Sequence, residues 1–551
     1  MVKRNRKANG IRSASAKLVV AALAIAMLAG CSGKPKSDDS SGKPFPKLQL
    51  LYNISESHKL IAETLQQMWK KELGIQVDLA NVEWKTYLKS LQSLDYQIAR
   101  AGWIGDYPDP NTFLDMFVTD GGNNQTGWSN AEYDRLIKEA SMEGDADERM
   151  KMFHDAEEIL MKEMPIMPIY FYVNKNLVKD FVKGMHFNMR DLHILKYVYL
   201  EKNGKVLPPQ EQVFHFNLSA EPETLDPGLM TGSVEFTIST QIFEGLVQYD
   251  PDTLEPIPGM AESWEVNDEH TEFVFHLRRD AKWTNGDPVT AGDFVYSWKR
   301  VLEPETTAEY AYQLFYIKNA KKYYDKEISD FSQVGLKAVD DFTLKVTLDS
   351  PTHFWLDLLA FHTLMPVNKN CVEKYNDKWT RPENIVTNGP FKLTEWKPKS
   401  KLVMVKNPGY YDAAKVRLSK LVAYSVEDNI TAVSMFEAGQ SYWVNTIPLP
   451  YSEKYSNDPQ AKKTDFLAVY YYRFNTTKEP LNDPRVRRAL NLAINKDELV
   501  KFVTKSGEKT ATTFVPHMHM KDYEPPQGED YNPEEARRLL REAGYAVKTG
   551  K

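Results

Sequence analysis

Hydrophobic and polar residues follow one another in patterns that predict a mixed α/β fold. Residues 46–53 read PKLQLLYN and predict a strand, and a helical pattern runs from Ser57 to Trp69. Its apolar residues recur at helical spacing, and we expect them on one buried face: Leu60, Ile61, Leu65, Met68 and Trp69. Gly74 is expected to end this helix, and segments 75–84 and 96–103 predict further strands.

The same alternation of strands and helices continues to the end of the chain. Residues 130–161 predict a pair of helices, and 165–174 predict a buried strand. After a polar turn at 202–209 a second series begins, with a helix expected over 237–247. Gly and Pro are spread evenly, so we expect a folded chain throughout, apart from its first residues.

The first residues carry the pattern of an export signal. Several Lys and Arg residues precede an apolar run at 18–29, which reaches about 18 Å and is too short for the roughly 30 Å core of a bilayer. The run ends in Leu28-Ala29-Gly30-Cys31, which resembles the lipobox of bacterial lipoproteins. We expect a signal peptide over 1–30, acylation of Cys31 and a polar tether over 31–46. The alternative is a signal with an incidental cysteine.

Composition and motifs argue against a nucleic-acid-binding protein, a disulfide-bonded protein and an enzyme. The 551-residue chain has a formal net charge of -7 and a hydrophobic content of 42%, which suits a globular protein and offers no basic field for nucleic acid. Cys371 is the one other cysteine, so we expect no disulfide and a simply packed thiol. The sequence contains no HExxH, GxSxG or GxxxxGK[ST] motif, and the chain is predicted not to be an enzyme.

One acidic residue stands at an expected strand end. Asp106 lies in ARAGWIGDYPDP, residues 99–110, just before two prolines. Strand ends in α/β domains collect binding residues, although an Asp before prolines is also a common turn cap. A separate short cluster, PHMHM at 516–520, contains His517 and His519, which could take copper or zinc but lack distant partner ligands.

Several longer segments resemble the extracytoplasmic oligopeptide-binding proteins of ABC importers. They are FEGLVQYD at 243–250, the stretch from Met260 to Arg300, WTRPENIVTNGPFKLTEW at 379–396, the stretch from Tyr470 to Val500, and LLYNISESHKL with its continuation to Gly74. The resemblance covers nearly everything from Pro46 to Tyr545. It implies an α/β fold of the periplasmic-binding-protein type, with two lobes, three domains, mixed sheets and a cleft that closes about a hinge.

The segments stand in a displaced order. In the family the block FHFNLSAEPETLDP comes first and the LLYNISESHKL block last, whereas here the order is reversed, as in a circular permutation joined through 201–210. The implied domains are one lobe from 174–243 with 368–467, an accessory domain at 244–367, and a second lobe from 47–173 with 468–551. Such a chain keeps its fold if the joined ends lie close together, and otherwise would be inert.

The resemblance also implies roles for particular residues. Asp106 matches the family's aspartate that binds the ligand ammonium, and Gly102, Trp103 and Ile104 would pair with the ligand backbone. Thr231, Gly232 and Ser233 would lie across the cleft, in a looser match. Arg100 and His58 match residues that meet the ligand carboxylate. Three aromatic residues match pocket-lining positions and would otherwise be core: Trp84, Tyr172 and Tyr310.

The implied function is a receptor, held to the outer face of the membrane by lipid, that delivers short peptides to an ABC permease. The resemblance implies no cofactor, no nucleic-acid partner and a monomer. The open alternatives are a receptor of the same architecture for dipeptides, nickel chelates, haem or a signalling peptide, and an enzyme that the motif search did not reveal.

Overall fold

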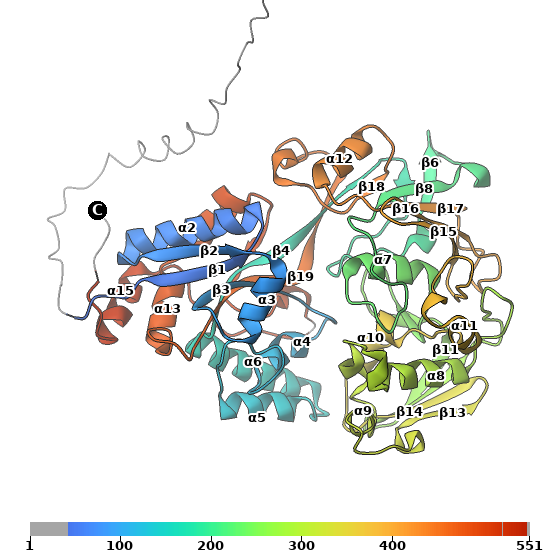
Figure 1. Cartoon of the computed structure of the whole chain (residues 1–551), viewed down its shortest axis with the longest axis horizontal. Helices are drawn as coiled ribbons and strands as arrows, with labels where there is room; N and C mark the ends of the chain where they lie inside the picture. Colours follow the sequence, from blue (N-terminus) through green and yellow to red (C-terminus); the bar gives the residue numbers. More distant parts are fainter. Residues whose placement is uncertain (1–41, 521, 548–551) are drawn as a thin grey trace, which may run out of the picture.

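The computed structural model describes residues 42–520 and 522–547, and it shows two α/β lobes joined by long strands (Figure 1). This architecture agrees with the predicted fold class. The predicted signal peptide and Cys31 lie outside the described residues. None of the described helices combines the length and the hydrophobicity that crossing a membrane would require.

The lobe on the left of Figure 1 is built from both ends of the described chain. Its first strands run parallel, with β1 (Leu48–Asn53) between β2 (Val77–Val82) and β3 (Ile98–Ile104). The short β20 (Lys509–Thr510) pairs with β4. The helices that cover this lobe are α2 (Glu56–Leu73), α3 (Trp84–Gln92), α4 (Asn111–Leu114), α5 (Ala131–Ala140), α6 (Ala146–Glu163), α13 (Pro484–Leu492), α14 (Lys496–Leu499) and α15 (Pro533–Glu542).

Two long antiparallel strands connect the lobes. The strands β4 (Ile166–Val178) and β19 (Ala461–Phe474) pair along most of their length, with register shifts between Asp465 and Val469. The far end of β4 pairs with β18 (Trp443–Val444), which continues the sheet into the other lobe. The sheet order is β15-β16-β17-β8-β18-β4-β19-β3-β1-β2. Because bulges bend a strand, these shifts let one sheet serve two lobes.

The lobe on the right of Figure 1 contains the other half of this sheet and a smaller sheet below it. Its strands in the large sheet are β8 (Val213–Asn217), β15 (Phe391–Lys397), β16 (Lys401–Lys406) and β17 (Lys420–Tyr424). The smaller sheet consists of β11 (Ala261–Val266), β12 (Glu272–Leu277), β14 (Thr343–Thr347) and β13 (Leu336–Asp340), in that order. The helices are α7 (Ser233–Ile242), α8 (Ala291–Leu302), α9 (Ala320–Tyr324), α10 (Trp355–Leu358), α11 (Lys369–Tyr375) and α12 (Asn429–Glu437).

The remaining strands are short. β9 (Val247–Tyr249) pairs with β10 (Pro256–Pro258), and β5 (Val182–Lys183) pairs with β6 (Tyr199–Lys202). β6 and β7 (Lys205–Val206) form an exposed hairpin around Asn203 and Gly204, within the predicted junction at 201–210. At the ends of the described chain, the Lys43 amide donates to the carbonyl oxygen of Gly544 at 2.9 Å. The segments beside Lys43 and Tyr545 therefore lie next to each other.

The local predictions hold with three corrections. The strand predicted over 75–84 ends at Val82, and Trp84 begins α3. The helix of residues 56–73 ends at Gly74, whose φ of 71° is the left-handed conformation that glycine adopts readily, and Ile61, Leu65 and Trp69 are buried. Leu60 was expected on the buried face but is 39% exposed, because it lines a surface cavity. The helix predicted over 237–247 instead spans 233–242, and Val247 begins β9.

The predicted packing of Cys371 is confirmed. The side chain is buried, and its Sγ lies 3.1 Å from the carbonyl oxygen of Asn384.

Candidate functional site

A cavity of about 540 Å³ lies between the lobes. Seven of the residues predicted for the site line it: Gly102, Trp103, Ile104, Asp106, Thr231, Ser233 and Tyr310. They come from the end of β3 on one lobe and from the start of α7 and the 310–314 region on the other. The fold therefore brings these distant sequence segments together around one space.

Asp106 is a half-buried carboxylate at the β3 end of the cavity. Its amide donates to Oγ1 of Thr112 at 3.1 Å, which fixes the backbone, and Oδ2 accepts a hydrogen bond of 3.4 Å from the hydroxyl of Tyr312. Burial raises the pKa of Asp106 to about 6, against the opposing effects of the Arg190 charge and the Tyr312 hydrogen bond. A carboxylate with one long hydrogen bond has room for a further donor.

The strand β3 presents a free edge beside Asp106. β19 pairs with the whole of β3 on one side, whereas β1 reaches only Ile98 and Ala99 on the other. The Gly105 amide donates to Leu467 of β19, so in an antiparallel ladder the alternate residues Gly102 and Ile104 direct their N–H and C=O groups away from β19. No backbone partner for these groups occurs within residues 42–520 and 522–547, so an added extended chain could pair with them.

The opposite side of the cavity lies at the start of α7. Thr231 and Ser233 line the cavity and are exposed, whereas Gly232 does not line it. Gly232 is instead the N-cap residue of α7, with an extended backbone at φ -116° and ψ 156°. A Cβ there would lie 2.5 Å from Oε2 of Glu235, so the glycine makes room for that side chain.

Arg100, His58 and Tyr172 form a second group around Tyr470, next to the cavity. Arg100 Nη2 donates to the Tyr172 hydroxyl at 2.9 Å, and its guanidinium lies 4.8 Å from the Tyr470 ring centroid. The Nε of Arg100 is buried, and no residue in the described part of the chain hydrogen-bonds to it. His58 Nδ1 lies 3.3 Å from the Tyr470 hydroxyl, and burial, assisted by the Arg100 charge, lowers the pKa of His58 to about 3. His58 is therefore neutral near neutral pH.

Gly102 brings this group close to the free strand edge. A Cβ at Gly102 would lie 3.1 Å from the Tyr172 hydroxyl and 3.3 Å from Arg100 Nη2. The absence of a side chain thus lets both polar groups approach β3. Tyr172 also lines a second cavity of about 330 Å³ together with Leu60.

The structure describes the side chain of Tyr310 but not that of Trp84, the two remaining aromatic residues predicted for the site. Tyr310 lines the central cavity, and its ring centroid lies 5.1 Å from that of Phe361 and 5.7 Å from that of Tyr312. Trp84 begins α3, but its side chain lies outside the described part of the structure.

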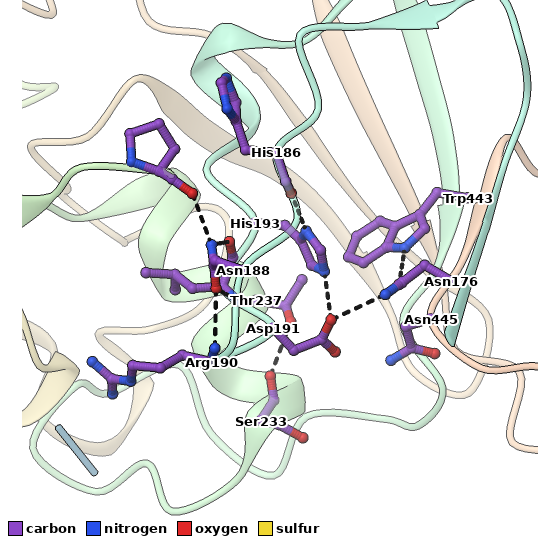
Figure 2. Close-up of polar contacts among 12 residues, drawn as sticks. Asn176, His186, Asn188, Arg190, Asp191, His193, Ser233, Thr237, Trp443 and Asn445 are labelled. Carbon is purple, nitrogen blue, oxygen red and sulfur yellow. Dashed lines mark hydrogen bonds and ion pairs between the residues drawn. The ribbon is translucent and has the colours of Figure 1, made fainter. Parts of the chain in front are cut away.

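Sequence reasoning missed the loop that precedes β6. Arg190, Asp191 and His193 line the cavity, as do Trp443 and Asn445 from the region of β18. Figure 2 shows a chain of hydrogen bonds in which Oδ1 of Asp191 accepts from Asn176 at 3.1 Å and contacts His193 Nε2 at 2.9 Å. Asn176 in turn accepts from the Trp443 indole at 2.7 Å. The φ of 53° at Asp191 is the left-handed conformation, which the sequence offers no glycine to signal.

The PHMHM cluster is described in part, because the side chain of His519 lies outside the described structure. His517 packs edge-on against Phe171, with ring centroids 6.2 Å apart. Within residues 42–520 and 522–547, no group of three or more His, Cys, Asp or Glu side chains is arranged to hold a metal ion.

A family model decides the classification. Residues 17–125 and 255–551, more than half of the chain, match the bacterial extracellular solute-binding proteins, family 5. The chain belongs to this family. Family 5 proteins of similar sequence include the periplasmic oligopeptide-binding protein OppA of Salmonella typhimurium, which is 38% identical over 60% of this chain and 62% of its own length. The oligopeptide-binding protein OppA of Bacillus subtilis is 37% identical over 57% of this chain and 58% of its own length.

Solved structures support the same fold. The Escherichia coli murein tripeptide binding protein MppA is 35% identical, with a TM-score of 0.54 over 60% of this chain and 66% of that structure. Haemophilus influenzae OppA in complex with RPPGFSPFR is 29% identical, with a TM-score of 0.51 over 61% of this chain and 67% of that structure. This family 5 chain thus spans about 60% of the length of the curated relatives it matches.

Proposed function

We propose that this chain is an extracytoplasmic receptor that binds short peptides in an extended conformation and delivers them to an ABC permease. The observation that carries the proposal is Asp106, a half-buried carboxylate with a single long side-chain hydrogen bond, placed at one end of an interlobe cavity. A peptide ammonium would satisfy this carboxylate through a charge-assisted hydrogen bond. Relatives that are named oligopeptide-binding proteins support the choice of ligand.

The peptide backbone would pair with the free edge of β3. The N–H and C=O groups of Gly102 and Ile104 face away from β19, so an added strand would satisfy them and its own backbone at once. Because every peptide carries the same backbone groups, this mode of binding tolerates many sequences. Thr231 and Ser233 would face the peptide from the opposite lobe.

Arg100 would receive the peptide carboxylate. Its guanidinium lies beside Gly102 and carries an unpartnered Nε, whereas His58 has a depressed pKa and supplies no charge near neutral pH. Gly102 and Asp106 are four positions apart, which corresponds to about 13 Å at the rise of a strand. This distance suits peptides of about three to four residues.

The cavity is proposed to bind without catalysis and without a cofactor. Among the described residues that line the cavity, Ser233, His193 and Asp191 are of the residue types that form a hydrolytic triad. However, both ring nitrogens of His193 are engaged, Nε2 with Asp191 and Nδ1 with the carbonyl oxygen of His186 at 3.0 Å. Neither nitrogen is available to activate the Ser233 hydroxyl.

The rearranged order of the family segments is proposed to be a circular permutation that keeps the fold, with the domain boundaries given above. The exposed β6–β7 hairpin provides a short junction, and the segments beside Lys43 and Tyr545 are adjacent. A permutation would also limit a linear alignment to one part of each relative. We further propose that lipid on Cys31 anchors the receptor and that it acts as a monomer.

Native mass spectrometry of the protein purified without residues 1–30 tests the proposed function. A receptor of this kind is expected to retain cellular peptides, which would appear as bound masses of roughly 300 to 500 Da for the expected length. Added synthetic tetrapeptides should replace them. A protein that carries no such masses and binds none of the added tetrapeptides would contradict the proposal.

A further inference from the structure

Arg190 is the one Lys or Arg side chain that lines the central cavity within the described part of the chain. It is half-buried, and its guanidinium lies 4.7 Å from the centroid of the Tyr249 ring. Nη1 is buried and has no hydrogen-bond partner among the described residues. A buried charged N–H group without an acceptor is costly, so a ligand that supplies an acceptor there would be stabilised.

The backbone places Arg190 close to Asp106. The Gly105 amide donates to the Leu467 carbonyl at 2.8 Å, and the Leu467 amide donates to the Met189 carbonyl at 2.6 Å. Leu467 therefore lies between Gly105 and Met189. Asp106 directly follows Gly105 and Arg190 directly follows Met189, so the backbones of Asp106 and Arg190 lie about two strand spacings, or roughly 10 Å, apart. Arg190 therefore stands at the end of the cavity where the peptide ammonium would bind.

Among the described residues the neighbouring acidic groups form no ion pair with Arg190, whose guanidinium contacts Tyr249. Asp106 is the proposed partner of the ammonium, and Oδ1 of Asp191 is already engaged with Asn176 and His193. Figure 2 shows the Arg190 side chain extending away from Asp191. Asp357 also senses the Arg190 charge, and burial raises its pKa to about 7, so it is a weak competitor.

We propose that Arg190 is a specificity-determining residue that selects peptides with an acidic first residue. The inference rests on the proposed function, because it requires a peptide ammonium at Asp106. With the ammonium held there, the side chain of the first residue lies within the space between Asp106 and Arg190, and its carboxylate would form a charge-assisted hydrogen bond with the guanidinium.

Titration calorimetry with two matched peptides tests this proposal. Asp-Ala-Ala-Ala and Asn-Ala-Ala-Ala differ in a single charge at nearly constant shape. The wild-type protein is expected to bind the Asp peptide about tenfold more tightly, the ratio typical of one charge-assisted hydrogen bond. Ala-Asp-Ala-Ala and Ala-Asn-Ala-Ala are the positional control and should bind within twofold of each other. An equal or larger preference at the second position would overturn the assignment to the first residue.

Arg190→Met removes the charge and keeps much of the apolar stem. It should reduce the Asp-to-Asn ratio to less than twofold, while Arg190→Lys should retain a preference for Asp. If Arg190 only neutralised Asp106, Arg190→Met would change both affinities equally and leave the ratio unchanged, which would overturn the proposal. Circular dichroism melts verify that each variant folds. If Arg190→Met does not fold, the wild-type protein still tests the proposal, because an Asp-to-Asn affinity ratio below twofold would overturn it.

The wild-type measurements also separate this inference from the proposed function. Tight binding of both peptides with equal affinity would remove Arg190 from its role and leave the peptide receptor intact. Binding of neither peptide would reject both.

Discussion

The hydroxyl of Tyr312 donates to Oδ2 of Asp106 across the space between the lobes, at 3.4 Å. Tyr312 is 42% exposed, and the bond is long, so it stabilises the carboxylate only weakly. We interpret it as a contact that an incoming ammonium replaces. The predictions below follow from the groups that surround this carboxylate.

Peptide affinity should fall in mildly acidic solution. Burial raises the pKa of Asp106 to about 6, so at pH 5 about nine in ten of the free proteins carry a proton on this group. The ammonium needs the ionised form, and we therefore expect affinity for a peptide with a free amino terminus to fall about tenfold between pH 7.5 and pH 5. Titration calorimetry at both pH values measures this change. The matched control is the N-acetylated peptide, whose weaker affinity should stay nearly constant; an equal fall for both peptides would exclude Asp106 as the cause.

Asp106→Asn should stabilise the folded chain at neutral pH. The pKa of Asp106 is raised in the folded state, so that state keeps a proton which the unfolded state loses between about pH 4 and pH 6. Stability is therefore complete below pH 4 and decreases as the pH rises to 6. Removing the charge should raise the free energy of unfolding by about 1 kcal/mol at pH 7, after allowance for partial exposure, and should have no such effect at pH 4. Urea unfolding at the two pH values tests this, and a variant less stable than wild type at pH 7 would contradict it.

The buried ion pair of Asp109 and Arg149 should be required for stability of the Asp106 loop. Arg149 donates to both carboxylate oxygens of Asp109, at 2.7 and 2.9 Å, and both residues are buried. Arg149→Met would leave the buried Asp109 charge without its ion-pair partner, with the Asn111 amide as a remaining hydrogen-bond donor, at an expected cost of about 3 to 5 kcal/mol. Urea unfolding measures this loss. Asp109→Asn combined with Arg149→Met should recover part of it, and a loss below 1 kcal/mol in the single variant would contradict the prediction.

Arg100 should matter for the peptide carboxylate more than His58 does. Arg100→Met is expected to weaken binding of a tetrapeptide with a free carboxylate by tenfold or more, because a charged partner is lost beside Gly102. His58→Gln should change affinity less, since the pKa of His58 is lowered to about 3 and the ring is neutral. Peptides with an amidated carboxyl end are the control and should be nearly indifferent to Arg100→Met. Equal losses for free and amidated peptides would indicate a structural role for Arg100.

The sequence predicted those parts of the site that lie on regular elements. Period-two and helical patterns located β1, α2 and β3, and the resemblance placed Asp106 and Gly102 at the cavity. The exposure of Leu60 was not predicted, because a helical pattern identifies the apolar face of a helix but does not show that one residue of that face lines a surface cavity. Arg190 and Asp191 lie in a loop without periodicity. The hydrogen bond between Asp191 and Asn176, and the one from Trp443 to Asn176, depend on strand pairings between distant segments.

The most direct test of the account is a calorimetric cycle that crosses Asp106→Asn with N-acetylation of one tetrapeptide. If the Asp106 carboxylate holds the peptide ammonium, the substitution should weaken the free peptide by about tenfold or more and the acetylated peptide by less than twofold. If the substitution weakened both peptides by the same factor, the carboxylate would not contact the ammonium, and the proposed mode of binding would be wrong.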